Sequence, residues 1–280
     1  MAPTWLVQVR SGPGTSAGWS LSGGTSVPPF AFLMSETRYE QLVDAARADE
    51  RVLGLVLTGS RGRGVFVRED SDWDVRLVVS GDALSGCEER YETPHGSPVE
   101  VAVYSLEQFV QAGEIGSANE WDRYSYVHTQ VVLDKDGTIA EHVARKSVLP
   151  ADEALDFAAR ALDGYINAYH RSAKNAGAGL SVEAHLDAAE SVGPFLTTLF
   201  AVHQRVRPFN KYLRWELESF PLGDELWSAG ALLPRLEAIV ATGALATQAS
   251  LFRDVEALAR RHGLGYVVDS WRRDVALLRG

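Results

Sequence analysis

Two aspartates, Asp72 and Asp74, stand two residues apart at the start of an apolar segment. In a β-strand, residues i and i+2 point to the same face, so both carboxylates are expected to project together, about 6–7 Å apart. At an effective dielectric constant near 20 their repulsion is on the order of 2–3 kcal/mol. A compensating cation would favour such a pair, and Mg²⁺ prefers oxygen ligands of this kind.

A third carboxylate follows in the next apolar segment, where Glu100 alternates with valines over residues 99–103. An acid in a buried strand is costly unless a cation satisfies it. If this strand pairs beside the first, three carboxylates converge, and three acids can hold two Mg²⁺ ions about 3.5–4 Å apart for in-line displacement at phosphorus. The alternative is that all three acids lie at solvated strand edges.

A glycine-rich turn precedes the two aspartates, with the sequence Gly59-Ser60-Arg61-Gly62-Arg63-Gly64. Bare backbone N–H groups and the Ser60 hydroxyl can cradle phosphate oxygens, and Arg61 can add a charged contact. The arginines could equally be solvated loop residues. Val65 and Phe66 stand where a P-loop needs Lys and Ser/Thr, and the glycine spacing fails the dinucleotide-binding fingerprint.

These elements together resemble the DNA polymerase β-type nucleotidyltransferase superfamily over roughly residues 38–137: Gly59-Ser60, Gly64, Asp72-x-Asp74 and Glu100. The combined pattern is specific, whereas any one element alone is weak. The resemblance implies a short mixed sheet with helices on one side. It also implies Mg²⁺-dependent transfer of a nucleotidyl group from a nucleoside triphosphate to a hydroxyl, with release of pyrophosphate. By the match, the three acids are the implied metal ligands and catalytic residues, and Gly59-Ser60 the implied triphosphate loop.

The second half of the chain extends the resemblance more loosely. A helical half after the sheet is similar to the layout of antibiotic nucleotidyltransferases that modify aminoglycosides. This implies ATP as the simplest nucleotide and a small aminoglycoside-like acceptor. Two alternatives remain open, namely a protein or tRNA acceptor, and a non-catalytic nucleotide-binding module.

The elements that must position these residues follow from hydrophobic periodicity. We expect an α+β chain, in which a sheet with helices precedes an all-helical half, with domains at 34–149 and 150–280. Residues 1–33 are rich in Gly, Ser, Pro and Thr, so we expect a disordered leader and regard Met34 as a candidate start. A helix is expected at 35–49, with a capping box at Thr37 and Glu40. Strands are expected at 52–58, 73–79, 99–104 and 126–133. A helix is expected within part of 106–118, and further helices at 209–220, 231–241, 246–262 and 268–278.

A basic cluster in the helical half has no acid within it: Arg205, Arg207, Lys211 and Arg214. Lys211 and Tyr212 together are expected to reach the triphosphate or to stack on the base. The alternative is a solvated basic face.

A general base must accept the proton of the acceptor hydroxyl. The sequence leaves the choice open among Glu183, His185, Asp187, Glu190 and Glu100 itself.

Composition sets limits on the partners and the compartment. The 280 residues carry a net charge of -10, which disfavours nonspecific binding to nucleic acid. Cys87 is the single cysteine, so an intrachain disulfide and a cysteine-based zinc site are excluded. The sequence contains no long apolar run and no secretory signal pattern, which predicts a cytoplasmic protein. The oligomeric state is not predicted.

Overall fold

The computed structural model describes residues 29–280, with side chains from residue 35 onward. The expected leader therefore lies outside the described residues, except for its last five positions, which belong to helix α1 (Pro29–Ala48). This helix begins six residues earlier than predicted and runs through Thr37, so the predicted capping box is wrong. Pro29 suits the first helical position because its missing N–H needs no partner there.

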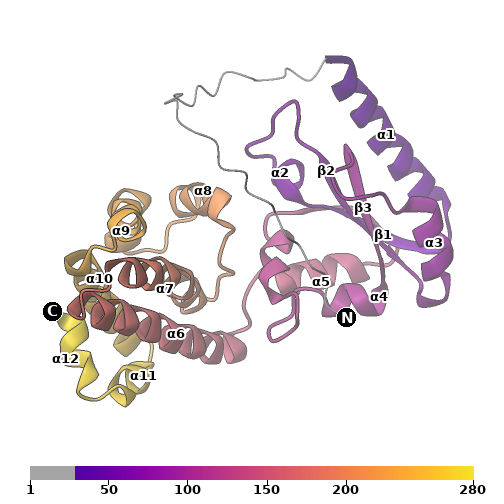
Figure 1. Cartoon of the computed structure of the whole chain (residues 1–280). Coiled ribbons are helices and arrows are strands. Elements are labelled where there is room, and N and C mark those ends of the chain that lie inside the picture. Colours follow the sequence, from indigo (N-terminus) through magenta and orange to yellow (C-terminus); the bar gives the residue numbers. More distant parts are fainter. Residues whose placement is uncertain (1–28) are drawn as a thin grey trace, which may run out of the picture.

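A four-stranded mixed sheet forms the first half of the molecule (Figure 1). The strand order is β3-β2-β1-β4, with β1 antiparallel to β2 and to β4, and β2 parallel to β3. The strands are β1 (Val52–Leu57), β2 (Trp73–Val79), β3 (Val99–Ser105) and β4 (Gln130–Asp134). The expected fold class, α+β, is confirmed.

Helices cover both faces of this sheet, whereas the family resemblance implied helices on one side. Helices α1 and α3 (Leu84–Tyr91) bury one face of the strands through residues such as Ala46 and Cys87. Helices α4 (Leu106–Gln111) and α5 (Thr138–Lys146) bury the other through residues such as Phe109 and Ile139. Odd-numbered β2 residues face the first layer, and even-numbered ones face the second, as the two-residue period of a strand requires. The remaining short elements are α2 (Gly59–Arg63), η1 (Gly81–Ala83) and η2 (Glu120–Tyr126).

The fourth strand begins at Gln130 and not at Tyr126, because Tyr126 is the last residue of η2 and residues 127–128 form a turn before the strand. Tyr124 and Tyr126 are fully buried in this 3₁₀ segment. Their aromatic character favours a strand by propensity, but tertiary packing decides the backbone here.

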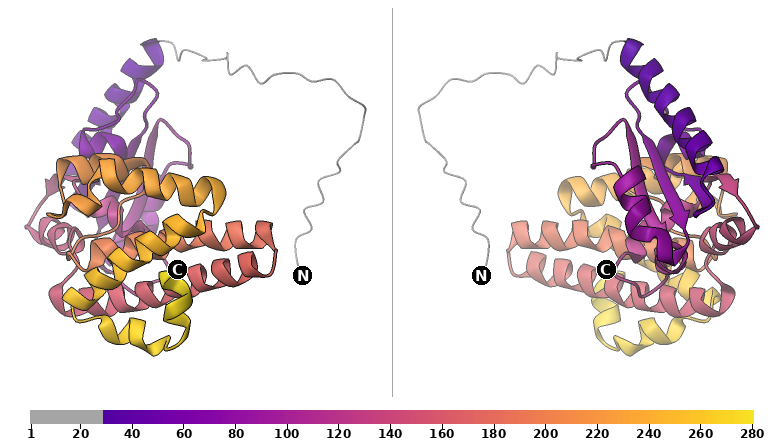
Figure 2. Two further views of the ribbon diagram at one scale, coloured as in Figure 1. Left: turned by 90° about the vertical axis from the view of Figure 1, so that its left-hand side faces the viewer. Right: turned by 90° about the vertical axis from the view of Figure 1, so that its right-hand side faces the viewer.

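The second half consists of helices only, beginning with the long antiparallel pair α6 (Ala151–Gly177) and α7 (Ser181–Ala201), which run side by side in Figure 2. The predicted helix at 209–220 is shorter and split, and so is the predicted helix at 268–278. The remaining elements are η3 (Asn210–Tyr212), α8 (Leu213–Ser219), η4 (Glu225–Trp227), α9 (Ala229–Thr242), α10 (Leu245–Arg261), α11 (Gly265–Ser270) and α12 (Asp274–Arg279).

The two halves meet around a buried carboxylate. Glu216 of α8 is 2% exposed and accepts a hydrogen bond from the Tyr124 hydroxyl at 2.9 Å. Its other oxygen lies 2.6 Å from the Arg205 guanidinium, and His128 Nε2 is 3.2 Å away. Burial alone would raise the pKa of this carboxyl, but His128, Arg205 and Tyr124 hold it below its usual range. The proposed division into domains at 149–150 stays a prediction.

Within residues 29–280, no helix combines the length and the apolar character needed to cross a membrane.

Candidate active site

The three acids predicted from the sequence lie together at one edge of the sheet. Because β2 and β3 are parallel neighbours, Asp74 and Glu100 occupy paired positions in the register. Asp72 directly precedes β2 and points to the same side as Asp74. One carboxylate oxygen from each of Asp72, Asp74 and Glu100 lies within 4.8 Å of the other two. The condition set by the sequence analysis, that the strand carrying Glu100 pairs beside the aspartates, is met.

Electrostatic repulsion marks the centre of this cluster. Burial, followed by the charges of Asp72 and Glu100, raises the pKa of Asp74 to about 6. Burial would also raise the pKa of Glu100. However, the Gly96 N–H at 2.9 Å and His95 Nδ1 at 2.8 Å hold that pKa below its usual range. The repulsion that raises the pKa of Asp74 would be relieved by a bound cation. Three neighbouring carboxylates are also the kind of oxygen ligands that a hard divalent cation such as Mg²⁺ prefers.

The glycine-rich turn packs directly on Asp74. The Thr58 N–H donates to the Asp74 carbonyl oxygen at 2.8 Å, and Gly59 follows with a φ of 64°. A Cβ at position 59 would lie 1.8 Å from Asp74 Oδ2, so only glycine allows this approach. The sequence predicts a glycine-rich turn here, but residues 59–63 form the short helix α2, which ends at Gly64 in the left-handed conformation.

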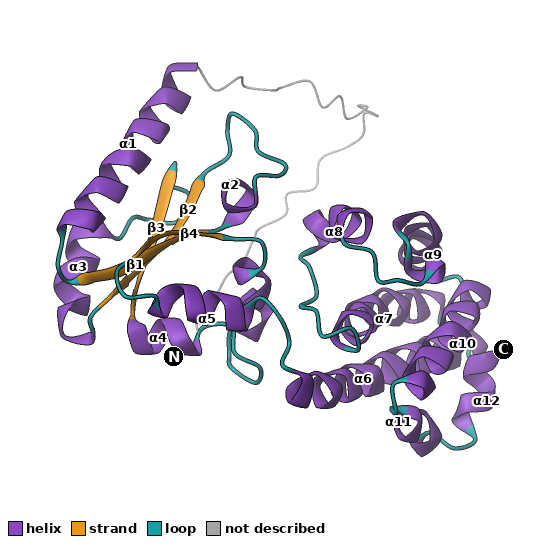
Figure 3. Cartoon of the chain, turned by 180° about the vertical axis from the view of Figure 1, so that it is seen from behind, coloured by secondary structure: helices purple, strands orange, loops and turns teal. Residues whose placement is uncertain are grey.

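Ser60 and Lys211 share a cavity of about 450 Å³ with Asp72. The cavity wall therefore combines a hydroxyl from α2, a carboxylate of the acidic cluster and an ammonium group from the helical half. Figure 3 shows that α2 and the loop into β2 lie on the side of the sheet that faces α8. Ser60 and Lys211 thus line one cavity, and their contact with a triphosphate stays a prediction.

Tyr212 is not placed as expected. It is 4% exposed, and the Arg63 guanidinium carbon lies 4.7 Å from its ring centroid. Its ring also packs 5.9 Å from that of Tyr124. A buried ring between these partners offers no face for a base to stack on, so the predicted stacking role of Tyr212 is wrong. The residue instead joins the glycine-rich turn to the helical half.

The two arginines of the turn also face inward. Arg61 Nε donates to the Ser71 carbonyl at 3.0 Å, and its guanidinium carbon lies 4.3 Å from the Trp73 ring centroid. Arg63 donates to the Gly59 carbonyl at 3.0 Å and to the Tyr124 carbonyl. Arg61, predicted as a nucleotide contact, thus holds the segment that carries Asp72.

The positions of the candidate general bases distinguish those of the helical half from Glu100. Arg171 of α6 pairs with two acids of α7, Asp187 at 3.0 Å and Glu190 at 2.6 Å. His185 Nε2, also on α7, contacts the Val240 carbonyl. These groups are engaged within the helical half. Glu100 is the candidate that lies in the acidic cluster.

Sequence reasoning missed the support around Glu100. His95 and Gly96 form a polar turn directly before β3 and hold both oxygens of that carboxylate. It also missed Arg68 and Asp70, an exposed ion pair whose residues line the cavity beside Ser60. The signal for His95 and Gly96 was present as a run of turn residues at 93–97, three to seven residues before Glu100.

Comparisons with known proteins add little to this geometry. No family model and no curated protein matches the sequence. One solved structure with a similar arrangement is a nucleotidyltransferase-like protein from Exiguobacterium sibiricum 255-15, which is 9% identical. The match covers 86% of this chain and 91% of that chain, with a TM-score of 0.38. A likeness of this size assigns no function.

Proposed function

We propose that this protein is a Mg²⁺-dependent nucleotidyltransferase, with ATP as the first nucleotide to test. It would transfer a nucleotidyl group to a hydroxyl of an acceptor and release pyrophosphate. One observation carries the proposal: oxygens of Asp72, Asp74 and Glu100 lie within 4.8 Å of one another, and Asp72 lines a cavity together with Ser60 and Lys211.

Each residue has a role that its position supports. Asp72, Asp74 and Glu100 would hold the metal, which when bound supplies positive charge to the reacting phosphate. The Ser60 hydroxyl can donate to a phosphate oxygen, and the Lys211 ammonium can neutralise part of the triphosphate charge. Gly59 lets the turn approach Asp74, so the phosphate contacts and the acids stay close.

The proposed transfer exchanges one bond at phosphorus for another and involves no oxidation or reduction. The acceptor hydroxyl oxygen forms a bond to the α-phosphorus while the bond to the β-phosphate oxygen breaks, and pyrophosphate leaves. The hydroxyl proton passes to a base, for which Glu100 is the candidate within the cluster. Positioning and charge stabilisation supply most of the catalysis in such transfers.

The acceptor is proposed from the resemblance as a small aminoglycoside-like molecule. A panel of aminoglycosides, a protein mixture and tRNA, each incubated with an NTP and Mg²⁺, would separate the alternatives by intact-mass detection of the added nucleotide.

The decisive assay measures pyrophosphate release by the full chain with each NTP and acceptor, with and without Mg²⁺. Removing one acid, in Asp72→Asn or Glu100→Gln, should lower turnover about a hundredfold, equivalent to about 3 kcal/mol of barrier. Asp82→Asn, an exposed acid in η1, is the matched control and should keep wild-type turnover.

Two results would contradict the proposal. Wild-type turnover in both acid variants would remove the metal assignment. Thermal stabilisation by nucleotide and Mg²⁺ without pyrophosphate release for any acceptor would instead favour a non-catalytic nucleotide-binding module.

A further inference from the structure

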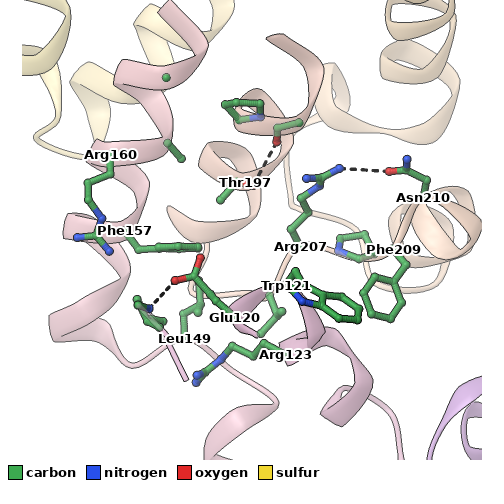
Figure 4. A pocket seen from close by; sticks show the side chains of 18 residues that line it. Glu120, Trp121, Arg123, Leu149, Phe157, Arg160, Thr197, Arg207, Phe209 and Asn210 are labelled. Atoms are coloured by element: carbon green, nitrogen blue, oxygen red, sulfur yellow. Dashed lines mark hydrogen bonds between the residues drawn. The ribbon is translucent and has the colours of Figure 1, made fainter. Parts of the chain in front are cut away.

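A second and larger cavity, of about 800 Å³, lies where the sheet half meets the helical half. Its walls come from η2, α6, α7 and residues 206–210, and Figure 4 shows their side chains around it. Its lining includes none of the three acids of the candidate active site. Residue 210 lines this cavity and residue 211 lines the smaller one, so η3 separates the two.

Aromatic and small residues give this cavity an apolar interior. Trp121, Phe157 and Phe209 line it, and Trp121 is 73% exposed although it is a large apolar side chain. Gly164 and Gly193 line it from the interiors of α6 and α7, where glycine is unfavourable for the helix. A Cβ at Gly164 would contact Pro194 at 3.7 Å, and one at Gly193 would lie 3.5 Å from Arg207 Nη1, so these glycines let Pro194 and Arg207 pack closely at the cavity wall.

Arg207 is the polar group best placed to meet a ligand there. Its Nε is buried and has no hydrogen-bond partner within residues 29–280, and its Nη2 lies 3.3 Å from Asn210 Oδ1. No carboxylate of the described chain lies within 4.0 Å of this guanidinium. Burial lowers the pKa of Arg207, as expected for a cation without a counterion. A partly buried guanidinium with no carboxylate beside it and a buried Nε without a partner is costly, and an anion would relieve that cost.

The other charged groups of the cavity give it an excess of positive charge. Arg160 also has no carboxylate of the described residues within 4.0 Å. In the view of Figure 4, Arg160 and Arg207 stand on different sides, with Phe157 and Glu120 between them. Among the described residues that line the cavity, Glu120 is the one acid, and it accepts the Gly116 N–H at 2.5 Å. Two unpaired arginines are notable in a chain with a net charge of -10.

We propose that this cavity binds a small organic anion, in which a carboxylate or phosphate group meets Arg207 and an aromatic or apolar body lies against Phe157 and Trp121. Arg160, at the exposed side, attracts the same charge. A polycationic ligand is disfavoured because it would face both guanidinium groups. This inference concerns binding alone, so it does not depend on the proposed nucleotidyl transfer.

The test uses two probes with the same ring and opposite charge, indole-3-propionate and tryptamine. Their binding to the full chain is measured by calorimetry in EDTA without nucleotide, so that a failure of the proposed transfer cannot affect the result. We expect indole-3-propionate to bind about tenfold or more tightly than tryptamine, since a charge-assisted hydrogen bond distinguishes them.

Two variants locate the site. Arg207→Gln should weaken indole-3-propionate binding about tenfold or more, and Ala161→Phe, which fills the cavity, should abolish it. Arg214→Gln is the matched control, because Arg214 is exposed on α8 and pairs with Glu218 at 3.6 Å. It should leave binding unchanged. Urea unfolding of each variant checks that it is folded.

Three results would overturn the proposal. They are equal or weaker binding of the anion relative to tryptamine, wild-type binding in a folded Arg207→Gln variant, and wild-type binding in a folded Ala161→Phe variant. Absence of measurable binding for indole-3-propionate and also for phenyl phosphate would overturn it too.

Discussion

Replacing Asp74 by asparagine should make the metal-free protein more stable at neutral pH. Asp74 lies half-buried between Asp72 and Glu100, and its ionised form is repelled by both. Asparagine keeps the shape of the side chain and removes the charge. If this substitution raises the free energy of unfolding, the carboxylates of the candidate active site repel one another when no cation is bound.

The magnitude follows from two estimates. Two unit charges at the 4.8 Å limit repel by about 3 kcal/mol at an effective dielectric constant near 20. A rise in the pKa of Asp74 from 3.8 to about 6, to which burial contributes most and the charges of Asp72 and Glu100 next, corresponds to about 3 kcal/mol for burial and repulsion together. Because Asp72 is exposed and solvent screens its charge, we expect about 1–2 kcal/mol for Asp74→Asn in EDTA at about pH 7.5.

The pH dependence has a defined sign. A carboxyl whose folded-state pKa is raised destabilises the fold fully above about pH 6, and this cost disappears as the pH falls toward 3.8. The stability difference between Asp74→Asn and wild type should therefore fall by about half at about pH 5. Urea unfolding in EDTA at the two pH values measures it, and subtracting the wild-type curve removes the contributions of other titrating groups.

Two comparisons complete this experiment. Asp82→Asn removes an exposed acid and should change stability by less than about 0.5 kcal/mol at both pH values. Added Mg²⁺ should stabilise wild type more than Asp74→Asn. An Asp74→Asn variant that is equally or less stable than wild type in EDTA at about pH 7.5 would refute the repulsion argument.

Three further substitutions test the packing around the site, each by urea unfolding. Gly59→Ala should lower the free energy of unfolding by about 2–4 kcal/mol, because the new Cβ would lie 1.8 Å from the Asp74 carboxylate. Gly64→Ala, at a similar positive φ with open space around it, should lower it by about 1 kcal/mol. Equal losses in the two variants would contradict the close approach of Gly59 to Asp74. Glu216→Gln should lower the free energy of unfolding by about 2–4 kcal/mol, because it weakens a buried ion-pair network. Glu218→Gln on the same helix should change it by less than about 0.5 kcal/mol. A small effect in both variants would show that the contact between the halves contributes little to stability. Burial lowers the pKa of Lys146 to about 8, so above that pH the unfolded state binds more protons than the folded state. The free energy of unfolding of wild type should therefore rise by about 2 kcal/mol relative to that of Lys146→Met between about pH 7 and 9.5. A constant difference between the two would mean that this ammonium keeps an ordinary pKa.

Local sequence determined the parts of this protein that depend on residues close together in the chain. The two-residue period places Asp72 and Asp74 on one side of β2 wherever that strand lies. Hydrophobic periodicity also distinguished the sheet half from the helical half. The close approach of the glycine-rich turn to Asp74 was less visible, because the 1.8 Å contact of Gly59 depends on how β1 and β2 pair.

Tertiary structure alone decided which side chains face the cavities. Arg61 and Tyr212 have types that suit nucleotide binding, yet packing turns one toward Trp73 and buries the other against Arg63. Lys211, next to Tyr212 in the chain, faces the cavity. Neighbouring residues of a 3₁₀ turn point in different directions, and the sequence does not state which direction is inward.

Long-range pairing set the remaining features. Glu100 reaches Asp74 because β3 joins β2 in parallel, a choice that the apolar pattern of either strand leaves open. Glu216 meets Tyr124 across 92 positions of the chain, and the cavity around Arg207 is formed by segments from both halves. Sequence periodicity reports which face of an element is buried, whereas the partner of that face depends on the free energy of the whole packed chain.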